Sequence, residues 1–369
     1  MNELVVIVQP YVPHYRVPFF ESLVHELAAD GIICRVAAGD ATGNQKLRDD
    51  ASDRQPWMRS YVPKRIAAGR RAIDLGGAAK EWADATGVIV GLQGTLLDTY
   101  RALLGSGEKR VGLWGHVGSY VSPRNPLDHR LERWQARRAD HIFAYTSSGS
   151  EQAARMGVDP DRITTVMNSM ATTELLHEYA SIQSEAIEEF ETRYGLTKGK
   201  TIAYVGGIDE NKHIDLLVDT LDLLWKHDPQ IKLLIGGKGV LAHRFTRAMA
   251  RGQAHHLGYA DDKLLAMIGA VSSAITMPGR IGLISIQALA LGLPILTTSF
   301  RYHAPEFEYL EEGRSVHLSK ETPSEYAHLV HTHLANVGRV RPGSWTYPTL
   351  TGMVHNFAAG VRRMLVKDL

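Results

Sequence analysis

Apolar and polar positions fall into two alternating patterns along the chain. Short, nearly continuous apolar runs are typical of buried strands, and the longer segments between them repeat apolar residues every three or four positions, as helices do. In the first half, strands are predicted at Leu4–Gln9, Ile32–Ala37, Gly87–Leu92, Arg110–Trp114 and His141–Tyr145. Helices are predicted from Pro18 onward and at Leu96–Leu104, Leu127–Arg138 and Ser148–Met156.

The same alternation restarts in the second half of the chain. Strands are predicted at Thr201–Val205, Lys232–Ile235, His255–Gly258, Ala270–Met277 and Ile295–Thr298. Because strands that alternate with helices build parallel sheets covered on both faces, the fold class is α/β, with two Rossmann-like doubly wound domains.

The length of 369 residues exceeds one ordinary core and favours two domains. We expect domains over 1–171 and 201–345, joined by a charged helical linker over 172–200. Residues 346–369 are expected to form a C-terminal helix, which either stays with the second domain or returns to the first. In such sheets ligands bind beyond the carboxyl ends of the strands, so the loops there are the candidates.

Glycines follow successive strands of the second half. The glycine pairs are Gly206/Gly207, Gly236/Gly237 and Gly279/Gly282, with Lys212 and Lys238 nearby. Glycine lets the backbone approach a ligand closely, and converging strand ends with cations beside them favour an anion. The alternative is a set of βαβ turns that need glycine only for packing.

One of these loops opens a helix. The backbone N–H groups of Gly282, Leu283 and Ile284 lie where helical donors are unpaired and the dipole is positive. A phosphate fits such a helix start. The sequence contains neither GxxxxGK[ST] nor a tight GxGxxG after the first strand, which disfavours an ordinary P-loop or dinucleotide enzyme.

Two loops of the first half carry candidate side chains. The loop after the first strand contains Tyr11, His14, Tyr15 and Arg16, which either line an acceptor pocket or decorate the surface. His116 lies between glycines at a strand end, where it either orients a hydroxyl or passes a proton, or belongs to a plain turn.

Two segments of the first half are basic and aromatic. Arg54–Arg71 has six basic residues and no acid, and Arg130–Arg138 adds arginines beside an apolar stripe. Both suit a membrane surface with anionic lipid, and the alternative is a solvated basic face. With a net charge of only +1, nucleic acid is disfavoured as a partner.

The composition is that of a soluble globular protein, 44% hydrophobic and 22% charged. Cys34 is the single cysteine and is expected to be a buried thiol, which excludes a disulfide framework or a cysteine zinc site within one chain. Met1–Val8 lacks the pattern of a signal peptide, and no apolar run is long enough to span a membrane. A cytoplasmic location is expected, either free or peripheral at the inner face of the plasma membrane.

Several motifs together resemble glycosyltransferase family 4, which has the GT-B fold of two domains facing across a cleft. The second half resembles its donor domain through YVGGIDENKHIDLLVDTL, KLLIGGKG, HHLGYADDKLLAMIGAVSSAITMP and GLISIQALALGLPILTT. The first half resembles its acceptor domain through PYVPHYRVPFFESL, LWGHVG and RADHIFAYTSSGSEQAARMGVDPDRITTVMNS. PGRIGL and HAPE are similar to a PGxxGL…HxPE variant branch.

The resemblance implies a role for individual residues. Lys212 would hold the donor diphosphate, and Gly282, Leu283 and Ile284 would bond phosphate and sugar through the backbone. His116 stands near the catalytic histidine of the acceptor domain. Around these, the implied donor site contains Gly206, Gly207, Gly236, Gly237, Lys238, Leu257 (toward the nucleobase), Arg280 and Gln287.

The chain departs from the usual family pattern at three positions. Gly207 stands where an arginine usually accompanies the lysine, and Gly279 and Gln287 stand where the family has two glutamates. Glutamine still bonds ribose hydroxyls, because an amide both donates and accepts. Arg280 is a candidate to supply the charge missing at Gly207, and a surface arginine is the alternative.

The resemblance implies a retaining transfer of a hexose from a nucleoside diphosphate sugar. A lipid-linked or cell-envelope glycan acceptor is expected, and neither a metal nor a cofactor is expected, because no Asp-x-Asp follows a strand. The alternatives are a catalytically silent homologue that acts as a binding or regulatory subunit, and a nucleotide-sugar epimerase of the same fold.

Overall fold

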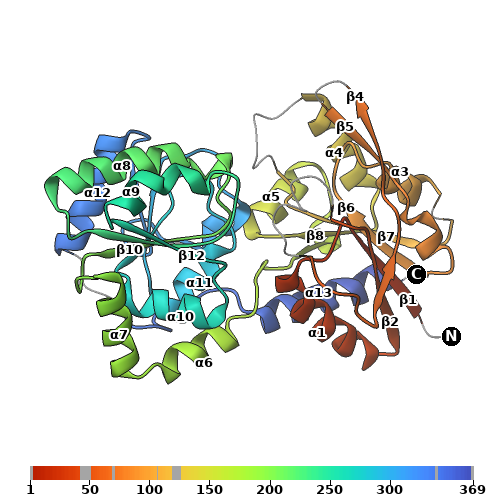
Figure 1. The fold of residues 1–369 in the computed structure, drawn as a ribbon. Helices are drawn as coiled ribbons and strands as arrows, with labels where there is room; N and C mark the ends of the chain where they lie inside the picture. The colour runs from red at the N-terminus through yellow and green to blue at the C-terminus, as the bar shows by residue number, and fades with distance from the viewer. Residues whose placement is uncertain are drawn as a thin grey trace. The chain divides into compact units, whose positions relative to one another are not determined.

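The computed structural model describes residues 3–41, 51–68, 71–105, 107–118, 126–336 and 340–366, without the side chains of 64–74. The chain divides into two compact units (Figure 1). Unit 1 comprises Met1–Ala171 and Pro348–Leu369, and unit 2 comprises Thr172–Tyr347. The chain therefore passes between the units twice, once in each direction.

Unit 1 is built on a parallel sheet. Among its described residues the strand order is β3-β2-β1-β6-β7-β8-β9. The strands are β1 (Glu3–Gln9), β2 (Ile32–Ala38), β3 (Met58–Ser60), β6 (Gly87–Gly91), β7 (Arg110–Gly115), β8 (His141–Ala144) and β9 (Ile163–Thr165). A separate antiparallel hairpin joins β4 (Lys64–Ala68) to β5 (Arg71–Gly76).

Helices cover both faces of this sheet, because side chains of a strand point alternately to opposite sides. Val5 and Ile7 of β1 lie in one core with α1 and α13, and Val6 lies in the core of the other face (Figure 1). The helices of unit 1 are α1 (Val17–Ala28), α3 (Leu97–Leu104), α4 (Pro126–Arg138), α5 (Ser147–Arg155) and α13 (Leu350–Leu365). Short 3-10 turns form at His14–Arg16, Ala78–Trp82 and Pro160–Arg162.

Unit 2 has a second parallel sheet, with the order β12-β11-β10-β13-β14-β15 in the described residues. Its strands are β10 (Thr201–Val205), β11 (Lys232–Gly236), β12 (Ala254–Gly258), β13 (Ala274–Thr276), β14 (Ile295–Thr298) and β15 (Val316–Ser319). Its helices are α6 (Thr173–Ser181), α7 (Ser184–Tyr194), α8 (Ile214–His227), α9 (Thr246–Ala250), α10 (Asp262–Val271), α11 (Ile284–Leu291) and α12 (Pro323–Asn336). Short 3-10 turns form at Glu210–Lys212, Ala242–Phe245 and Pro305–Tyr309.

Two segments expected outside the domains are integrated into them. Residues 172–200, predicted as a linker, form α6 and α7, and apolar side chains of both helices pack on the core of unit 2. The C-terminal helix α13 belongs to unit 1, where Phe357 stacks on Phe143 with ring centroids 4.5 Å apart.

The doubly wound α/β fold predicted from the sequence is confirmed. One strand was predicted too long: of Ala270–Met277, the first residues end α10, and only Ala274–Thr276 pair as β13. Cys34 is buried as expected, and burial raises its pKa to about 12, so the thiol stays protonated. Among the described residues no helix is long and apolar enough to cross a membrane.

Candidate functional site

Glycine turns line the carboxyl edge of the sheet in unit 2. Gly206 follows β10 with φ +141°, a conformation that side chains disfavour, and exposed Gly207 follows it. A Cβ on Gly237 would lie 1.9 Å from the carbonyl oxygen of Gly206, so these backbones approach as only glycine permits. The N–H of Gly237 donates to Gly258 O (2.6 Å), and the N–H of Gly206 donates to Gly236 O (2.9 Å).

The loop after β13 closes tightly over the turn that carries Lys212. A Cβ on Gly279 would lie 2.4 Å from Asn211 O, which leaves no room for a side chain at this position. The N–H of Arg280 donates to Asn211 O (2.8 Å). Half-buried Lys212 donates from Nζ to Arg280 O (2.5 Å) and lies 3.6 Å from Met277 Sδ. The Lys212 side chain is therefore held against the backbone of Arg280.

The helix that opens from this loop presents backbone donors. α11 begins at Ile284 after Leu283, and in the described chain no side chain caps it. The N–H of Ser285 already donates to Gly282 O (2.9 Å), whereas the N–H groups of Leu283 and Ile284 have no acceptor among the described residues. The nearest atom to a Cβ on Gly282 would be Ala304 Cβ at 3.6 Å, so this approach is uncrowded.

His303 supports the loop between β13 and α11, a role that the sequence did not reveal. Its Nδ1 accepts from the N–H of Ile281 (3.2 Å), and its ring stacks on Phe307 with centroids 3.9 Å apart. Burial lowers the pKa of His303 to about 4, assisted by the positive charges of Lys212 and Arg280. A neutral His303 accepts this hydrogen bond, so the imidazole holds the backbone of Ile281 in place.

The remaining predicted donor residues surround the same edge. Leu257 is half-buried at the end of β12 and packs on the core, and neighbouring His256 places Nε2 2.7 Å from Gly237 O. Lys238 is exposed beyond β11, and Gln287 is half-buried on α11. Whether Leu257 meets a nucleobase and Gln287 a ribose stays a prediction.

In unit 1, His116 follows β7 at the carboxyl edge of its sheet. The imidazole is half-buried and meets Tyr145 edge-on, with ring centroids 4.6 Å apart. Val117, the next residue, has φ +49°, which is uncommon without glycine and marks strained backbone. His116 is thus held on a sharp turn, and its catalytic role stays a prediction.

The loop after β1 presents only part of the predicted acceptor set. His14 and Tyr15 are exposed and Tyr11 is half-buried, so all three reach the surface. Arg16 is only 6% exposed, and its guanidinium donates to Asn168 Oδ1 (2.5 Å). This arginine holds the interior of unit 1 instead of facing an acceptor, because its donors are occupied by the protein.

One family model matches the part of the chain that carries the glycine-lined edge. Residues 199–336 match the family model described as "Glycosyl transferases group 1". The matched region is similar to a glycosyltransferase domain. It spans most of unit 2, including Lys212 and the loop before α11. No curated protein matches the chain.

Solved structures match both units together. HepE from Anabaena in complex with UDP-glucose is 14% identical, with 98% of this chain and 95% of that chain covered and a TM-score of 0.62. A glycosyltransferase from Rickettsia africae is 10% identical over 100% of both chains (TM-score 0.62). UDP-GlcNAc 2-epimerase from Methanocaldococcus jannaschii is 11% identical, covering 98% and 99% (TM-score 0.57). These likenesses show the GT-B fold.

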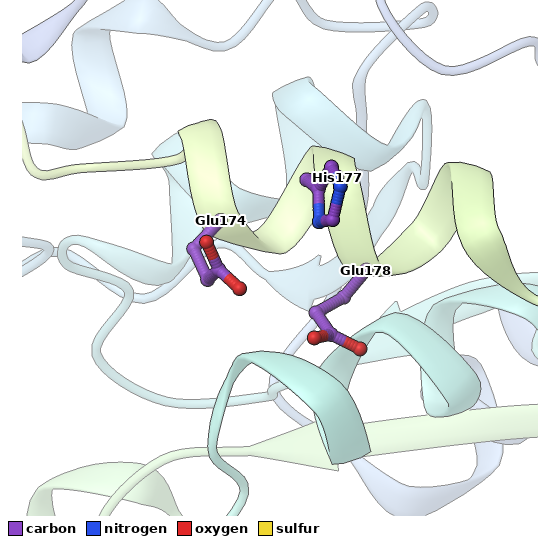
Figure 2. Close-up of side chains that lie close together, drawn as sticks. All are labelled: Glu174, His177 and Glu178. Atoms are coloured by element: carbon purple, nitrogen blue, oxygen red, sulfur yellow. The ribbon is translucent and has the colours of Figure 1, made fainter.

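Among the described residues, one group of potential metal ligands lies on α6, ahead of the matched region. Glu174, His177 and Glu178 place one ligand atom each within 4.8 Å of one another (Figure 2). Burial raises the pKa of Asp262 on α10, and Glu174 and Glu178 add to that shift by charge repulsion. All three residues lie on α6, and none belongs to the glycine-lined loops.

Proposed function

We propose that the chain transfers a hexose from a nucleoside diphosphate sugar to a glycan or lipid-linked acceptor, with retention at the anomeric carbon. The observation that carries this proposal is the contact of Lys212 with the Arg280 carbonyl, in the loop that leads into the uncapped start of α11 and within the region that matches the glycosyltransferase model. HepE, a structural neighbour, was solved with UDP-glucose, which supports a nucleotide sugar as the donor.

Few side chains of this site would be needed to neutralise the charge of a diphosphate. The N–H groups of Leu283 and Ile284 would bond phosphate oxygens, and Lys212 would exchange the Arg280 carbonyl for one of them. Arg280 would add the second charge that Gly207 lacks, since its backbone lies against Asn211 and Lys212. We expect this binding to need no metal, because two cations and a helix start oppose the diphosphate charge.

The chemical step requires stabilisation of the leaving group. As the bond between the anomeric carbon and the phosphate oxygen breaks, negative charge grows on the diphosphate. Preorganised donors that face this oxygen stabilise it by about 3 kcal/mol each in comparable sites. Retention, a hexose and a catalytic His116 follow from the family resemblance and belong to this proposal.

A donor panel tests the proposed function. Purified protein is incubated with UDP- and GDP-linked hexoses, and the release of nucleoside diphosphate is measured together with the identity of the remaining sugar. The proposal predicts release from one donor, reduced at least tenfold in Lys212→Ala but not in Lys226→Ala, an exposed lysine at the end of α8.

The other outcomes separate the alternative functions. Binding of a donor with no release and no change of sugar would identify a silent homologue that acts as a binding or regulatory subunit. An altered sugar on an intact nucleotide would identify an epimerase. Either result would overturn the transferase proposal.

The acceptor side includes a surface suited to anionic lipid. On α4, Leu127 is 57% exposed and Trp134 37% exposed. Arg130 and Arg137 are exposed on the same helix, and the Arg138 guanidinium lies 5.1 Å from the Trp134 ring centroid. Apolar and aromatic side chains among arginines bind membrane interfaces, which supports a peripheral location at the inner face of the plasma membrane.

The second basic segment is only partly described. Arg54 and Arg59 are exposed, whereas Arg70 and the side chains of residues 64–74 lie outside the described residues. The membrane proposal therefore rests on α4.

A further inference from the structure

A buried arginine joins three parts of unit 1 that are distant in sequence. Arg16 ends the loop after β1 and donates to Asn168 Oδ1 (2.5 Å) and to Ser169 O (3.3 Å). The same guanidinium lies 3.5 Å from Sδ of Met353 on α13. Its carbon lies 5.3 Å from the ring centroid of Tyr15, and the rings of Phe19 and Trp114 are at 5.8 and 5.7 Å.

No carboxylate balances this cation among the described residues. A buried charge is expensive, and it persists only where hydrogen bonds and polarisable neighbours replace water. Here an amide oxygen, a carbonyl oxygen and aromatic faces perform that task. Lysine is no substitute, because only the planar guanidinium reaches several acceptors in fixed directions.

The partners of Arg16 lie beside both points where the chain passes between the units. Asn168 and Ser169 precede the first passage after residue 171, and Met353 follows the second passage before residue 348. Ser169 connects the two: its Oγ donates to Pro348 O (2.5 Å), and its N–H lies 3.2 Å from Met353 Sδ. Arg16 therefore holds in one network the two segments that lead from one unit to the other, next to residues 171 and 348, which we call the passing segments.

The network also reaches the candidate catalytic residue. The N–H of Asn168 donates to Tyr145 O (2.8 Å), and the Tyr145 ring contacts the imidazole of His116. Met167, just before Asn168, has φ +54°, so strained backbone is maintained at this point.

We propose that Arg16 is a positioning residue for the transfer reaction. It fixes Asn168 and the passing segments, and through them it sets the geometry of His116 and of the loop that carries His14 and Tyr15. This role rests on the proposed function, and it differs from acceptor binding because the guanidinium is buried and both of its terminal nitrogens donate to groups of unit 1. Donor binding belongs to unit 2, so loss of Arg16 should impair turnover while nucleotide affinity is kept.

Hydrogen exchange tests the positioning role without any activity. Arg16→Met keeps the length of the side chain and removes its donors, and Asn168→Ser removes the main acceptor. We expect at least tenfold faster exchange in peptides covering 166–171 and 348–354, with peptides of β10 and β11 unchanged. Arg155→Met is the matched control, because Arg155 is exposed on α5 and pairs with Glu151.

Kinetics then tests whether this positioning serves the reaction. With the nucleotide sugar that the wild type turns over, kcat for its hydrolysis should fall at least tenfold in Arg16→Met and in Arg16→Lys. KM for the nucleotide sugar and the Kd of the nucleoside diphosphate should stay within twofold. A loss of nucleotide affinity, or an unchanged kcat, would overturn the proposal.

The two proposals fail in different ways. If the wild type turns over no nucleotide sugar, the transferase function fails, and exchange still decides whether Arg16 fixes the passing segments. If Arg16→Met does not fold, Asn168→Ser and Arg16→Lys carry the same comparison. Unchanged exchange in both folded variants would contradict the role of Arg16.

Discussion

The carboxyl edges of the two sheets are built by different means. In unit 2 the edge is formed by backbone, since glycines bring loops so close that a Cβ on Gly237 would fall 1.9 Å from a carbonyl oxygen. In unit 1 the edge relies more on side chains: Arg16 holds the Asn168 side chain, a backbone hydrogen bond joins Asn168 to Tyr145, and the Tyr145 ring contacts His116. Two sheets of the same topology class thus present a backbone surface in one case and a side-chain network in the other.

The difference fits the two proposed tasks. A diphosphate is met by N–H groups, which every residue carries, so glycine turns and a helix start are sufficient for much of the binding. An acceptor hydroxyl must be oriented toward one reacting carbon, which needs side chains held in fixed positions. The two edges should therefore respond to different kinds of substitution.

The largest expected effect is on stability at the backbone edge. Gly237→Ala should lower the free energy of unfolding by about 3 kcal/mol, because the new Cβ would overlap the carbonyl of Gly206. Gly94→Ala in unit 1 is the control, since its Cβ would meet Leu131 Cβ at an ordinary 3.4 Å. Urea unfolding of both variants measures the difference, and equal losses would contradict the close approach in unit 2.

A second test uses pH and involves both units. Burial lowers the pKa of His303 in unit 2 and of His141 in unit 1 to about 4. The unfolded chain binds these protons near pH 6.5, so stability is complete above that value and is lost as pH falls toward 4. Each histidine should contribute about 2 kcal/mol of loss between pH 7 and pH 5.

The check is urea unfolding at pH 7 and pH 5 for the wild type, His303→Asn and His141→Asn. Each substitution should flatten the pH dependence. A slope that both variants retain would show that the buried histidines are not its source.

A third test examines the proposal that Arg280 contributes a positive charge to the donor site at the backbone edge. Arg280→Ala should weaken binding of the nucleotide sugar about tenfold, the effect of one lost hydrogen bond to a charged group. Arg314→Ala, which removes an exposed arginine paired with Glu311, should leave affinity unchanged. Isothermal titration measures both affinities. An unaltered affinity in Arg280→Ala would show that this residue is a surface arginine with no role in donor binding.

The smallest effect concerns the outer surface of unit 1. Arg130→Gln and Arg137→Gln should each reduce partitioning onto phosphatidylserine vesicles about fivefold, since one basic residue near an anionic surface contributes about 1 kcal/mol. Arg155→Gln is the control on α5. Vesicle sedimentation at low and physiological salt gives the values, and equal binding by all three variants would rule out α4 as the contact.

The backbone edge was accessible from the sequence. Buried parallel strands give nearly continuous apolar runs, and glycine after such a run marks a close approach, so Gly206, Gly237 and Gly279 could be placed in advance. The short strands β3, β9 and β15 were missed, because three or four residues carry too little pattern. The absence of a carboxylate at Gly279 was seen, but only the structure shows that no side chain fits there.

The side-chain network was not accessible in the same way. Arg16 lies in a polar loop, and nothing local in the sequence indicates that residues 168, 169 and 353 enclose it. His303 was noted only as part of a motif, and its support of the loop at Ile281 depends on contacts across 22 positions. Both roles depend on contacts between residues that are far apart in the sequence, and local sequence patterns do not show such contacts.

The most direct test of the account is calorimetric titration of UDP and GDP into the wild type, Lys212→Ala and Lys226→Ala. We predict that one nucleotide binds the wild type and Lys226→Ala alike, and that Lys212→Ala binds it about ten- to a hundredfold more weakly, the effect of losing one charge-assisted hydrogen bond. Equal affinity in Lys212→Ala would contradict the central claim that this lysine and the start of α11 hold the diphosphate.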